Sequence, residues 1–125
     1  MNNEIFEGLI SLKELSKEED GKYILPFLIN KSSSVFEGHF PEKSILPGVV
    51  MIEITKRAMA LATNTKLKLK EAGNFKFLRM IDPDGVPNAE IHFSITQVAD
   101  VWKVKAHISF QNDIYFKANA QYELG

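Results

Sequence analysis

Apolar and polar residues alternate along much of the chain after residue 66, in segments separated by turn-forming residues. A period of two is typical of strands that bury one face. The segments that show it are residues 67–79, 89–99, 101–111 and 114–124. The turns between them are expected at 81–88, at Asp100 and at Asn112-Asp113. Long strands joined by short turns predict an antiparallel meander, in which His92 and His107 are interpreted as sheet-face residues.

The other segments that predict strands contain residues that limit where those strands can lie in a sheet. Asp20-Gly21 is a strong hairpin signal, and the apolar run that follows it at 23–31 predicts a strand. Pro26 lies inside this run, and because proline has no N–H to donate, it predicts an edge or bulged strand. Residues 72–74 (Ala-Gly-Asn) predict a break in the first alternating segment.

One segment predicts a helix, GVVMIEITKRAMALAT at residues 48–63. Its apolar positions cover a broad face, Pro47 suits a helix start, and Thr63-Asn64 is expected to end it. A single apolar helix needs a surface that covers it. The predicted fold is therefore α+β, an antiparallel sheet wrapped around one helix, and 125 residues fit one domain over 1–125.

Composition narrows the classes of function. Lys and Arg number 15 and Asp and Glu number 16, so the net charge of −1 gives no overall attraction to nucleic acid or an anionic membrane. The absence of cysteine excludes disulfides, thiolate metal sites and a cysteine nucleophile, and it suits a reducing cytosol. The first ten residues do not resemble a signal peptide, and no apolar run reaches the roughly 20 residues of a membrane span. We therefore expect a cytoplasmic protein without a membrane span.

The candidate chemistry lies in EGHFPEKSILPGVVMIE, residues 37–53. His39 stands in a loop rich in glycine and proline; a lone histidine is more often structural, yet a neutral imidazole is a natural general base. Glu53 is either a surface glutamate paired with Arg57 one turn on, or a partly buried acid that donates a proton. Gly48 is either conformational or the source of an N–H that stabilises an oxyanion.

The stretch GHFPEKSILPGVVMIE resembles the signature of the β-hydroxyacyl-ACP dehydratases of the hotdog-fold superfamily. In that family a Gly-His-Phe-Pro loop leads to a Pro-Gly at the start of a central helix, and an acid follows one to two turns later. Here 14 residues separate His39 from Glu53, as in members that use glutamate. NFKFLRMIDPDG at 74–85 is similar to a second family block. The resemblance implies a hotdog fold and a homodimer, or a higher assembly of dimers, in which each site takes its histidine and its acid from opposite subunits.

The resemblance also implies how the site works. The reaction would be the dehydration of a 3-hydroxyacyl thioester to the trans-2-enoyl thioester. His39 would take the C2 proton, the Gly48 N–H would hold the thioester oxygen, and Glu53 would help the C3 hydroxyl leave as water. No metal and no redox cofactor is implied.

Further roles concern the substrate and its delivery. Phe40, Pro47 and Val49 would contact the acyl substrate, which the phosphopantetheine of an acyl carrier protein would present. The carrier is acidic in such systems. Lys76 and Arg79 lie in the block that matches the family's basic strand, so the resemblance implies that they contact the carrier.

The chain also departs from the family pattern. Glu42 and Ser44 replace a usual glycine and proline, and Arg57 replaces a usual glutamine. A cation four residues after Glu53 favours the ionised carboxylate, which weakens the acid unless burial wins or Arg57 points away. Two alternatives therefore stay open, a non-catalytic carrier-binding or partner subunit and a hotdog acyl thioesterase. A compact, divergent member suits a specialised lipid or polyene pathway better than housekeeping fatty-acid synthesis.

Overall fold

The computed structural model describes residues 1–37 and 45–125, and these contain three helices and seven strands. The helices are α1 (Asn3–Leu9), the short 3₁₀ helix η1 (Ser34–Phe36) and α2 (Gly48–Thr63). The strands are β1 (Ile10–Leu12), β2 (Ser16–Lys17), β3 (Lys22–Ile29), β4 (Leu67–Phe77), β5 (Asn88–Val98), β6 (Val101–Phe110) and β7 (Asp113–Leu124). The predicted helix is confirmed with its expected bounds. The predicted site residues His39 and Phe40 lie outside the described residues.

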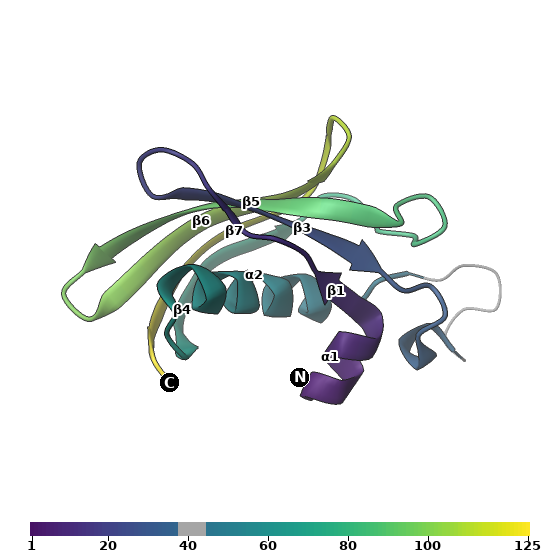
Figure 1. The fold of residues 1–125 in the computed structure, drawn as a ribbon, viewed down its shortest axis with the longest axis horizontal. Coiled ribbons are helices and arrows are strands. Elements are labelled where there is room, and N and C mark those ends of the chain that lie inside the picture. Colours follow the sequence, from purple (N-terminus) through teal and green to yellow (C-terminus); the bar gives the residue numbers. More distant parts are fainter. Residues whose placement is uncertain (38–44) are drawn as a thin grey trace.

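All the strands belong to one antiparallel sheet, and α2 lies along one of its faces (Figure 1). The strand order is β1-β3-β5-β6-β7-β4, and β2 pairs with β3 beside β1. The strands β5, β6 and β7 form a meander as predicted, but the first alternating segment, 67–79, is not part of it. β4, which follows α2 along the chain, pairs with β7 at the far edge. The α+β hotdog arrangement, a sheet wrapped around one long helix, is confirmed.

Tight turns between the strands fix their register. Asp20 (φ 55°) and Gly21 (φ 69°) both adopt positive φ in the turn between β2 and β3, which explains the Asp-Gly pair there. Ala99 (φ 56°) occupies the two-residue turn between β5 and β6. This turn places Val98 opposite Val101 and thereby sets every pair along the hairpin. The predicted turns at Asp20-Gly21, within 81–88 and at Asp100 are confirmed, whereas the turn predicted at Asn112-Asp113 lies one residue earlier, at Gln111-Asn112.

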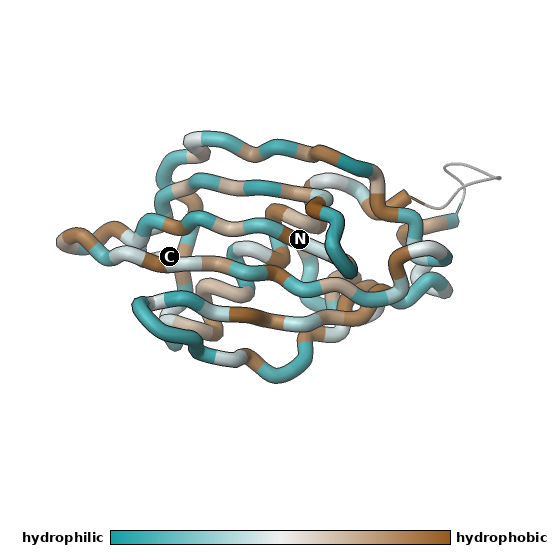
Figure 2. Tube along the Cα trace, turned by 90° about the horizontal axis from the view of Figure 1, so that it is seen from above, coloured by the Kyte–Doolittle hydropathy of each residue, from teal (hydrophilic) through white to brown (hydrophobic). Residues whose placement is uncertain are grey.

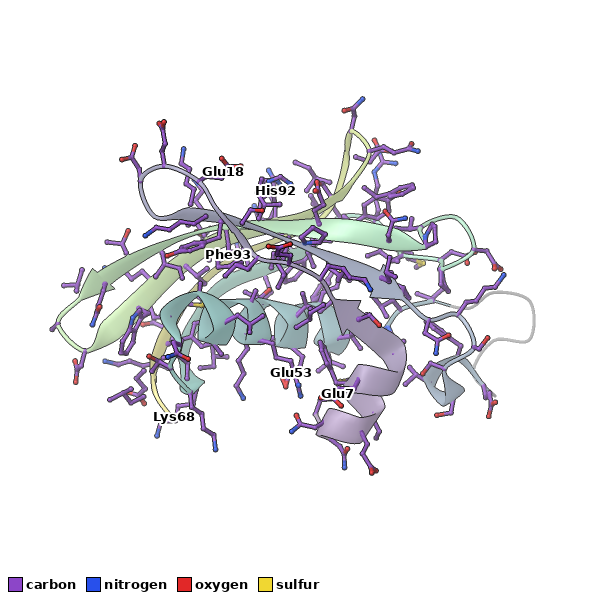
Figure 3. The ribbon with its side chains drawn as sticks, in the orientation of Figure 1. Glu7, Glu18, Glu53, Lys68, His92 and Phe93 are labelled. Atoms are coloured by element: carbon purple, nitrogen blue, oxygen red, sulfur yellow. The ribbon has the colours of Figure 1, made fainter. Side chains whose placement is uncertain are left out.

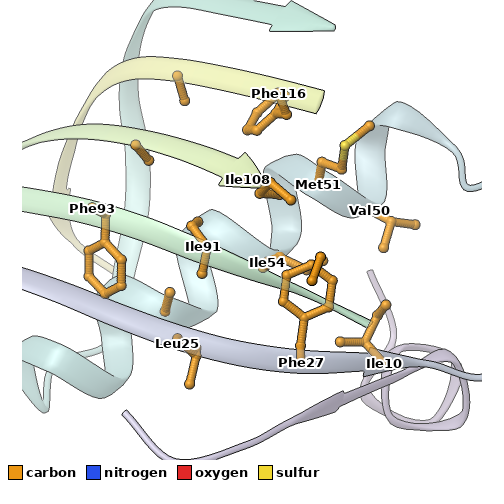
Figure 4. Packing of buried hydrophobic residues seen from close by; sticks show 14 of the residues in the cluster. Ile10, Leu25, Phe27, Val50, Met51, Ile54, Ile91, Phe93, Ile108 and Phe116 are labelled. Atoms are coloured by element: carbon orange, nitrogen blue, oxygen red, sulfur yellow. The ribbon is translucent and has the colours of Figure 1, made fainter. Parts of the chain in front are cut away.

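Hydrophilic and hydrophobic residues alternate along the strands (Figure 2), and successive side chains of a strand point to opposite faces of the sheet. The inner face packs against α2, whose buried residues recur with the spacing of one helical face. These helix residues are Val50, Met51, Ile54, Thr55, Ala58 and Met59. Opposite them lie Phe27, Ile91, Ile108 and Phe116 from four strands, all with 0% exposure (Figure 4). Burial of each such side chain contributes about 1.5–3 kcal/mol, so this face holds the helix in place.

The strand around Pro26 differs from the prediction. β3 pairs with β5 on one side and with β1 and β2 on the other, so the expected edge position is wrong. The Pro26 carbonyl accepts the Lys13 N–H at 2.8 Å, between the end of β1 and the start of β2. Because the nitrogen and carbonyl of one residue point to the same side of a strand, the missing N–H faces the gap between two short strands. The proline therefore keeps its place in the pairing with β5, and the bond that it cannot make is the reciprocal one to Lys13, just beyond the end of β1.

The predicted break in the alternation at 72–74 takes the form of an irregularity within one strand, since β4 runs without interruption from Leu67 to Phe77. Its register against β7 shifts between Leu69 and Glu71 and again between Ala72 and Asn74. Shifts of this kind are bulges, which insert one residue and bend the strand. At the second, an added Cβ on Gly73 would lie 3.1 Å from the Asn119 carbonyl oxygen, so the glycine permits a close approach of the two backbones.

Candidate active site at the start of the long helix

The first turn of α2 presents the predicted N–H donor. Pro47 is the N-cap residue with extended backbone angles, and Gly48 is the first helical residue. The first N–H groups of a helix have no acceptor inside it, and the helix dipole adds positive charge there. An added Cβ on Gly48 would lie 2.8 Å from Cε1 of Phe77, which packs against the helix start. The glycine therefore allows the Phe77 ring to pack directly against the helix start, and the Gly48 backbone N–H stays at the dipole's positive end.

Glu53 lies one and a half turns farther along α2, on the side away from the sheet and close to α1 (Figure 3). Its side chain is only 11% exposed. The carboxylate oxygen Oε1 lies 3.6 Å from the amino group of Met1 and 3.8 Å from Nε of Arg57. Glu53 is thus nearly enclosed, as the functional interpretation requires, but it faces two cations.

Arg57 fastens α1 to α2 as well as facing Glu53. Its Nη2 donates to Oδ1 of Asn3 at 2.8 Å, and its guanidinium carbon lies 4.0 Å above the centre of the Phe6 ring. Its Nε is buried without a hydrogen-bond partner among the described residues. The expectation that Arg57 shares a face with Glu53 is confirmed, and Arg57 does not point away. The contacts to α1 were not anticipated, because they join residues more than fifty positions apart.

Tyr122 is a buried polar residue near Glu53 that sequence analysis missed. It lies on the inner face of β7 and is 1% exposed, and its hydroxyl has no hydrogen-bond partner among the described residues. Burial, together with the negative charge of Glu53, raises the pKa of Tyr122 to about 12. The hydroxyl therefore stays protonated and is available to donate. Its place in the apolar alternation of 114–124 was the available signal, since a tyrosine on a buried face needs a partner.

Apolar side chains remain exposed beside the helix start. Val49 is 60% exposed on the helix, and Met80 is 75% exposed after β4, where Phe77, which packs against Gly48, and Leu78 are half exposed. Exposed apolar groups that gather at one place mark sites of interaction. The predicted substrate contact Val49 is thus open to a ligand or a second chain, whereas Pro47 is half-buried.

The predicted carrier contacts lie on and just after β4. Lys76 is exposed on the outer face and stands opposite Lys117 of β7. Arg79 forms an exposed ion pair with Asp113, with 3.5 Å between Nη2 and Oδ1. Phe77 lies between the two and touches Gly48. The structure therefore gathers Pro47, Gly48 and Val49 at one end of α2, places β4 beside them, and sets Glu53 farther along the same helix.

His92 and His107 are on the outer face of the sheet, as predicted, and they also form a stacked pair. The turn at 99–100 makes them cross-strand partners. Sequence analysis placed each histidine but missed the pairing, which the two-residue turn could have revealed. Neither histidine approaches α2, because the sheet separates them from it (Figure 3).

Solved structures share the hotdog architecture. The ApeI:P dehydratase heterocomplex from Xenorhabdus doucetiae matches with a TM-score of 0.70 and 11% identity, over 90% of this chain and 96% of that chain. A conserved protein from Pseudomonas aeruginosa matches with a TM-score of 0.68 and 8% identity, over 98% of this chain and 94% of that chain. At such low identities these matches show the fold alone. The class of protein is thus a hotdog-fold protein.

Sequence comparison identifies the family. Residues 15–112 match the family model described as ApeI dehydratase, ApeI-like. The 3-hydroxyacyl-[acyl-carrier-protein] dehydratase FabZ of Rickettsia massiliae is 30% identical over 88 residues, which cover 63% of this chain and 59% of that protein. FabZ of Rickettsia canadensis is also 30% identical, over 63% of this chain and 60% of that protein. The chain therefore spans about three fifths of the length of these curated relatives. The chain belongs to the ApeI-like dehydratase family.

Among the helices of residues 1–37 and 45–125, none is long and apolar enough to cross a membrane.

Proposed function

We propose that the chain dehydrates a 3-hydroxyacyl thioester to the trans-2-enoyl thioester. The observation that carries the proposal is the unit formed by the Gly-His-Phe-Pro sequence, Gly48 at the first residue of α2 and Glu53 in its second turn. Membership of a dehydratase family supports it. The FabZ relatives are named for a 3-hydroxyacyl-[acyl-carrier-protein] substrate, which supports the same substrate class here.

In the proposed step, one proton leaves C2 and the hydroxyl group leaves C3 as water. His39 accepts the C2 proton, and the electron pair forms the C2–C3 double bond as the C3–O bond breaks. The Gly48 N–H donates to the thioester oxygen, on which negative charge develops. Glu53 gives the leaving hydroxyl its proton, directly or through a held water, and the proton on His39 restores Glu53 through solvent. The reaction involves no net oxidation, so it requires no redox cofactor.

The surroundings of Glu53 set a condition on this step. The Met1 amino group and Nε of Arg57 lie 3.6 and 3.8 Å from Oε1, the carboxylate oxygen that the leaving hydroxyl would have to reach. The contact with Arg57 is loose, because Nε lies 3.8 Å from Oε1 and forms no hydrogen bond to a described residue. We propose that the bound substrate excludes water and displaces this contact, so that the Glu53 carboxyl group is free to reach the C3 hydroxyl.

The free edge of β4 supports a shared site. β4 pairs with β7 on one side only among the described residues, and most of its eleven residues are exposed. A long exposed edge strand is a template for pairing with another chain. We propose that two copies pair through β4 into a homodimer, alone or within a higher assembly of dimers, and that each site combines His39 of one copy with Glu53 of the other. The relative solved as a heterocomplex makes a different hotdog chain the competing partner.

We propose that an acyl carrier protein delivers the substrate in the cytoplasm. Phe40, Pro47 and the exposed Val49 would contact the acyl chain. Lys76 and Arg79 would receive the acidic carrier on the adjacent strand. The ion pair of Arg79 with Asp113 is exposed on both sides, and such pairs contribute little, so Arg79 can exchange this partner for the carrier.

The test is incubation of the purified chain with a 3-hydroxyacyl carrier thioester, followed by mass spectrometry. Loss of water from the acyl group is the expected result. His39→Ala and Glu53→Gln should each lower the rate by about a hundredfold or more, because positioned acids and bases contribute factors of this size. Glu7→Gln, an exposed carboxylate on α1, is the matched control and should keep the wild-type rate. Full activity of His39→Ala would overturn the proposed base.

The same assay separates a second candidate, a non-catalytic carrier-binding subunit. The two cations beside Glu53 favour this candidate, because they contact the carboxylate that the reaction requires. Intact substrate bound to the protein would support it, whereas release of the free acid would indicate a thioesterase. Light scattering measures the oligomeric state of the purified chain. A stable monomer would exclude a site shared between two copies.

A further inference from the structure

The outer face of the sheet, opposite α2, carries an ordered block of hydrogen-bond donors. The antiparallel register aligns His92 with His107 and His107 with Lys117, so that one row crosses β5, β6 and β7. The row beside it consists of Ser94, Lys105 and Asn119. Neighbouring strands lie about 4.8 Å apart and alternate residues on one strand lie about 6.5 Å apart, so these six side chains surround a small common area.

The two histidines at the centre are held by their neighbours. Their rings stack with 4.8 Å between centroids and 5° between planes. Nε2 of His92 lies 3.3 Å from Oε1 of Glu90, which orients the first ring. Both side chains are half-buried. The pair therefore presents fixed ring edges rather than mobile surface groups.

The block forms the floor of a groove with a volume of about 730 Å³. The turn between β2 and β3 rises at one end, and the turn between β6 and β7 also stands above this face (Figure 1). Figure 3 shows Glu18 and His92 on this side of the sheet and Glu53 beyond α2 on the other. Small-molecule sites are concave and range from roughly 300 to 1,000 Å³, so the groove has the size of a ligand site. The sheet separates it from the proposed dehydration site.

The charges in the groove favour an anion at its centre. Lys105 and Lys117 line the groove, and neither forms an ion pair with any described residue. Ser94 and Asn119 add neutral donors beside them. The acidic side chains lie on the turn at the end of the groove, so they limit how far a ligand extends without neutralising the floor. Ammonium, imidazole, hydroxyl and amide groups together supply the several donors that a phosphate accepts.

We propose that this groove binds a small molecule through a phosphate monoester group, with Lys105, Lys117 and His107 as its charged contacts. His92 supports the ring of His107, and the uncharged part of the ligand lies along the groove toward the turn between β2 and β3. The groove is separate from the proposed dehydration chemistry, and its occupation does not depend on that activity.

Protonation of His107 links this binding to pH. Burial lowers the pKa of His107, and the charges of His92 and Lys117 lower it further. The negative charge of a bound phosphate dianion opposes the effect of the His92 and Lys117 charges and favours the protonated ring of His107. The other charged groups that face the pair are Lys22 of β3, Glu18, Glu19 and Asp20 of the preceding turn, Glu90 of β5, Lys103 and Lys105 of β6, and Lys76 of β4. Binding of the dianion should therefore strengthen as the pH falls from about 8 to about 7, above the range near pH 6 in which the phosphate monoester itself takes up a proton.

The experiment is a titration of the full chain with inorganic phosphate and with phenyl phosphate, followed by the ring resonances of His92 and His107 in NMR spectra. We expect saturable shifts at both rings and tighter binding of phenyl phosphate, whose ring occupies the groove. Lys117→Ala and Lys105→Ala should each weaken binding about tenfold, the effect of losing one charged hydrogen bond. Lys31→Ala is the matched control, because Lys31 is an exposed lysine paired with Asp84 away from the groove, and it should bind as the wild type does.

Several outcomes would overturn the proposal. Absence of shifts at His107, equal weakening by Lys31→Ala, or undiminished binding after loss of Lys105 or Lys117 would each do so. A melting temperature measured for every variant shows that the fold is intact, and the single substitutions lie on exposed outer positions. If phosphate binds but the thioester is not dehydrated, the proposed function is contradicted and the proposed phosphate site is supported. If the thioester is dehydrated but phosphate does not bind, the phosphate site is contradicted and the proposed function is supported.

Discussion

The two faces of the sheet carry different kinds of residue although the same strands supply both. The inner face is apolar and is closed by α2, whose first two turns carry Gly48 and Glu53. The outer face is open and carries stacked histidines flanked by lysines. Because alternate residues of one strand point to opposite faces, a substitution at one position tests packing and a substitution at the next tests the surface. The fold thus positions the candidate active site through the inner face and leaves the outer face free for a ligand.

The largest contrast between the faces is expected at two adjacent residues of β3. Phe27 has 0% exposure on the inner face, whereas Leu28 is 43% exposed on the outer one. Phe27→Ala should lower the free energy of unfolding by about 3–5 kcal/mol, because it leaves a cavity against α2. Leu28→Ala should change it by no more than about 0.5 kcal/mol. Urea unfolding of both variants measures the difference, and similar losses would contradict the assignment of faces.

A smaller effect concerns the ionisation of the inner-face residue Tyr122. Its pKa is raised from 10.0 to about 12, so the folded protein retains the proton at a pH where the unfolded chain has lost it. The associated stability is fully present below pH 10 and is lost as the pH rises through about 12. Two pKa units correspond to about 3 kcal/mol. The measurement is the free energy of unfolding of the wild type and of Tyr122→Phe over this pH range.

Tyr122→Phe should lack this alkaline loss and should be as stable as the wild type at neutral pH, because it removes a buried hydroxyl without a described partner. A stability loss in the variant at neutral pH would show instead that the hydroxyl makes a valuable hydrogen bond in solution.

The smallest expected effect tests the contact between Arg57 and Glu53. Arg57→Gln removes the hydrogen bond to Asn3 and the cation–π contact with Phe6, which should cost about 1 kcal/mol. It also removes one of two cations beside Glu53, so the rate of dehydration at neutral pH should rise. The neighbouring Lys56→Gln is the control and should leave the rate unchanged. A slower Arg57→Gln enzyme would indicate that Arg57 positions Glu53 rather than suppressing it.

Much of the fold follows from local sequence signals. The helix at 48–63 has its expected bounds because Pro47 and Gly48 begin it and Asn64, with φ of 51°, ends it in the left-handed region that asparagine tolerates. The tight turn at 99–100 also sets the pairing of the two histidines. These features depend on residues that are neighbours in the chain or are joined by one turn.

Other features depend on contacts that local patterns do not encode. Pro26 is tolerated inside the sheet only because two short strands leave a gap opposite its nitrogen. Glu53 is enclosed by Met1 and α1. These residues are far from Glu53 in the sequence, and the fold brings them against α2. His39 and Phe40, to which the resemblance assigns roles, lie outside the described residues. These parts of the site stay predictions.

The central claim, that His39 of one copy acts with Glu53 of another, is tested most directly by mixing two inactive variants. His39→Ala and Glu53→Gln are purified separately, unfolded together, refolded, and assayed for loss of water from a 3-hydroxyacyl carrier thioester. Half of the dimers are then mixed and each mixed dimer has one intact site, so about a quarter of the wild-type activity should return. Each variant refolded alone should stay inactive. If the mixture is as inactive as the separate variants while wild-type protein recovers under the same conditions, the shared site is contradicted.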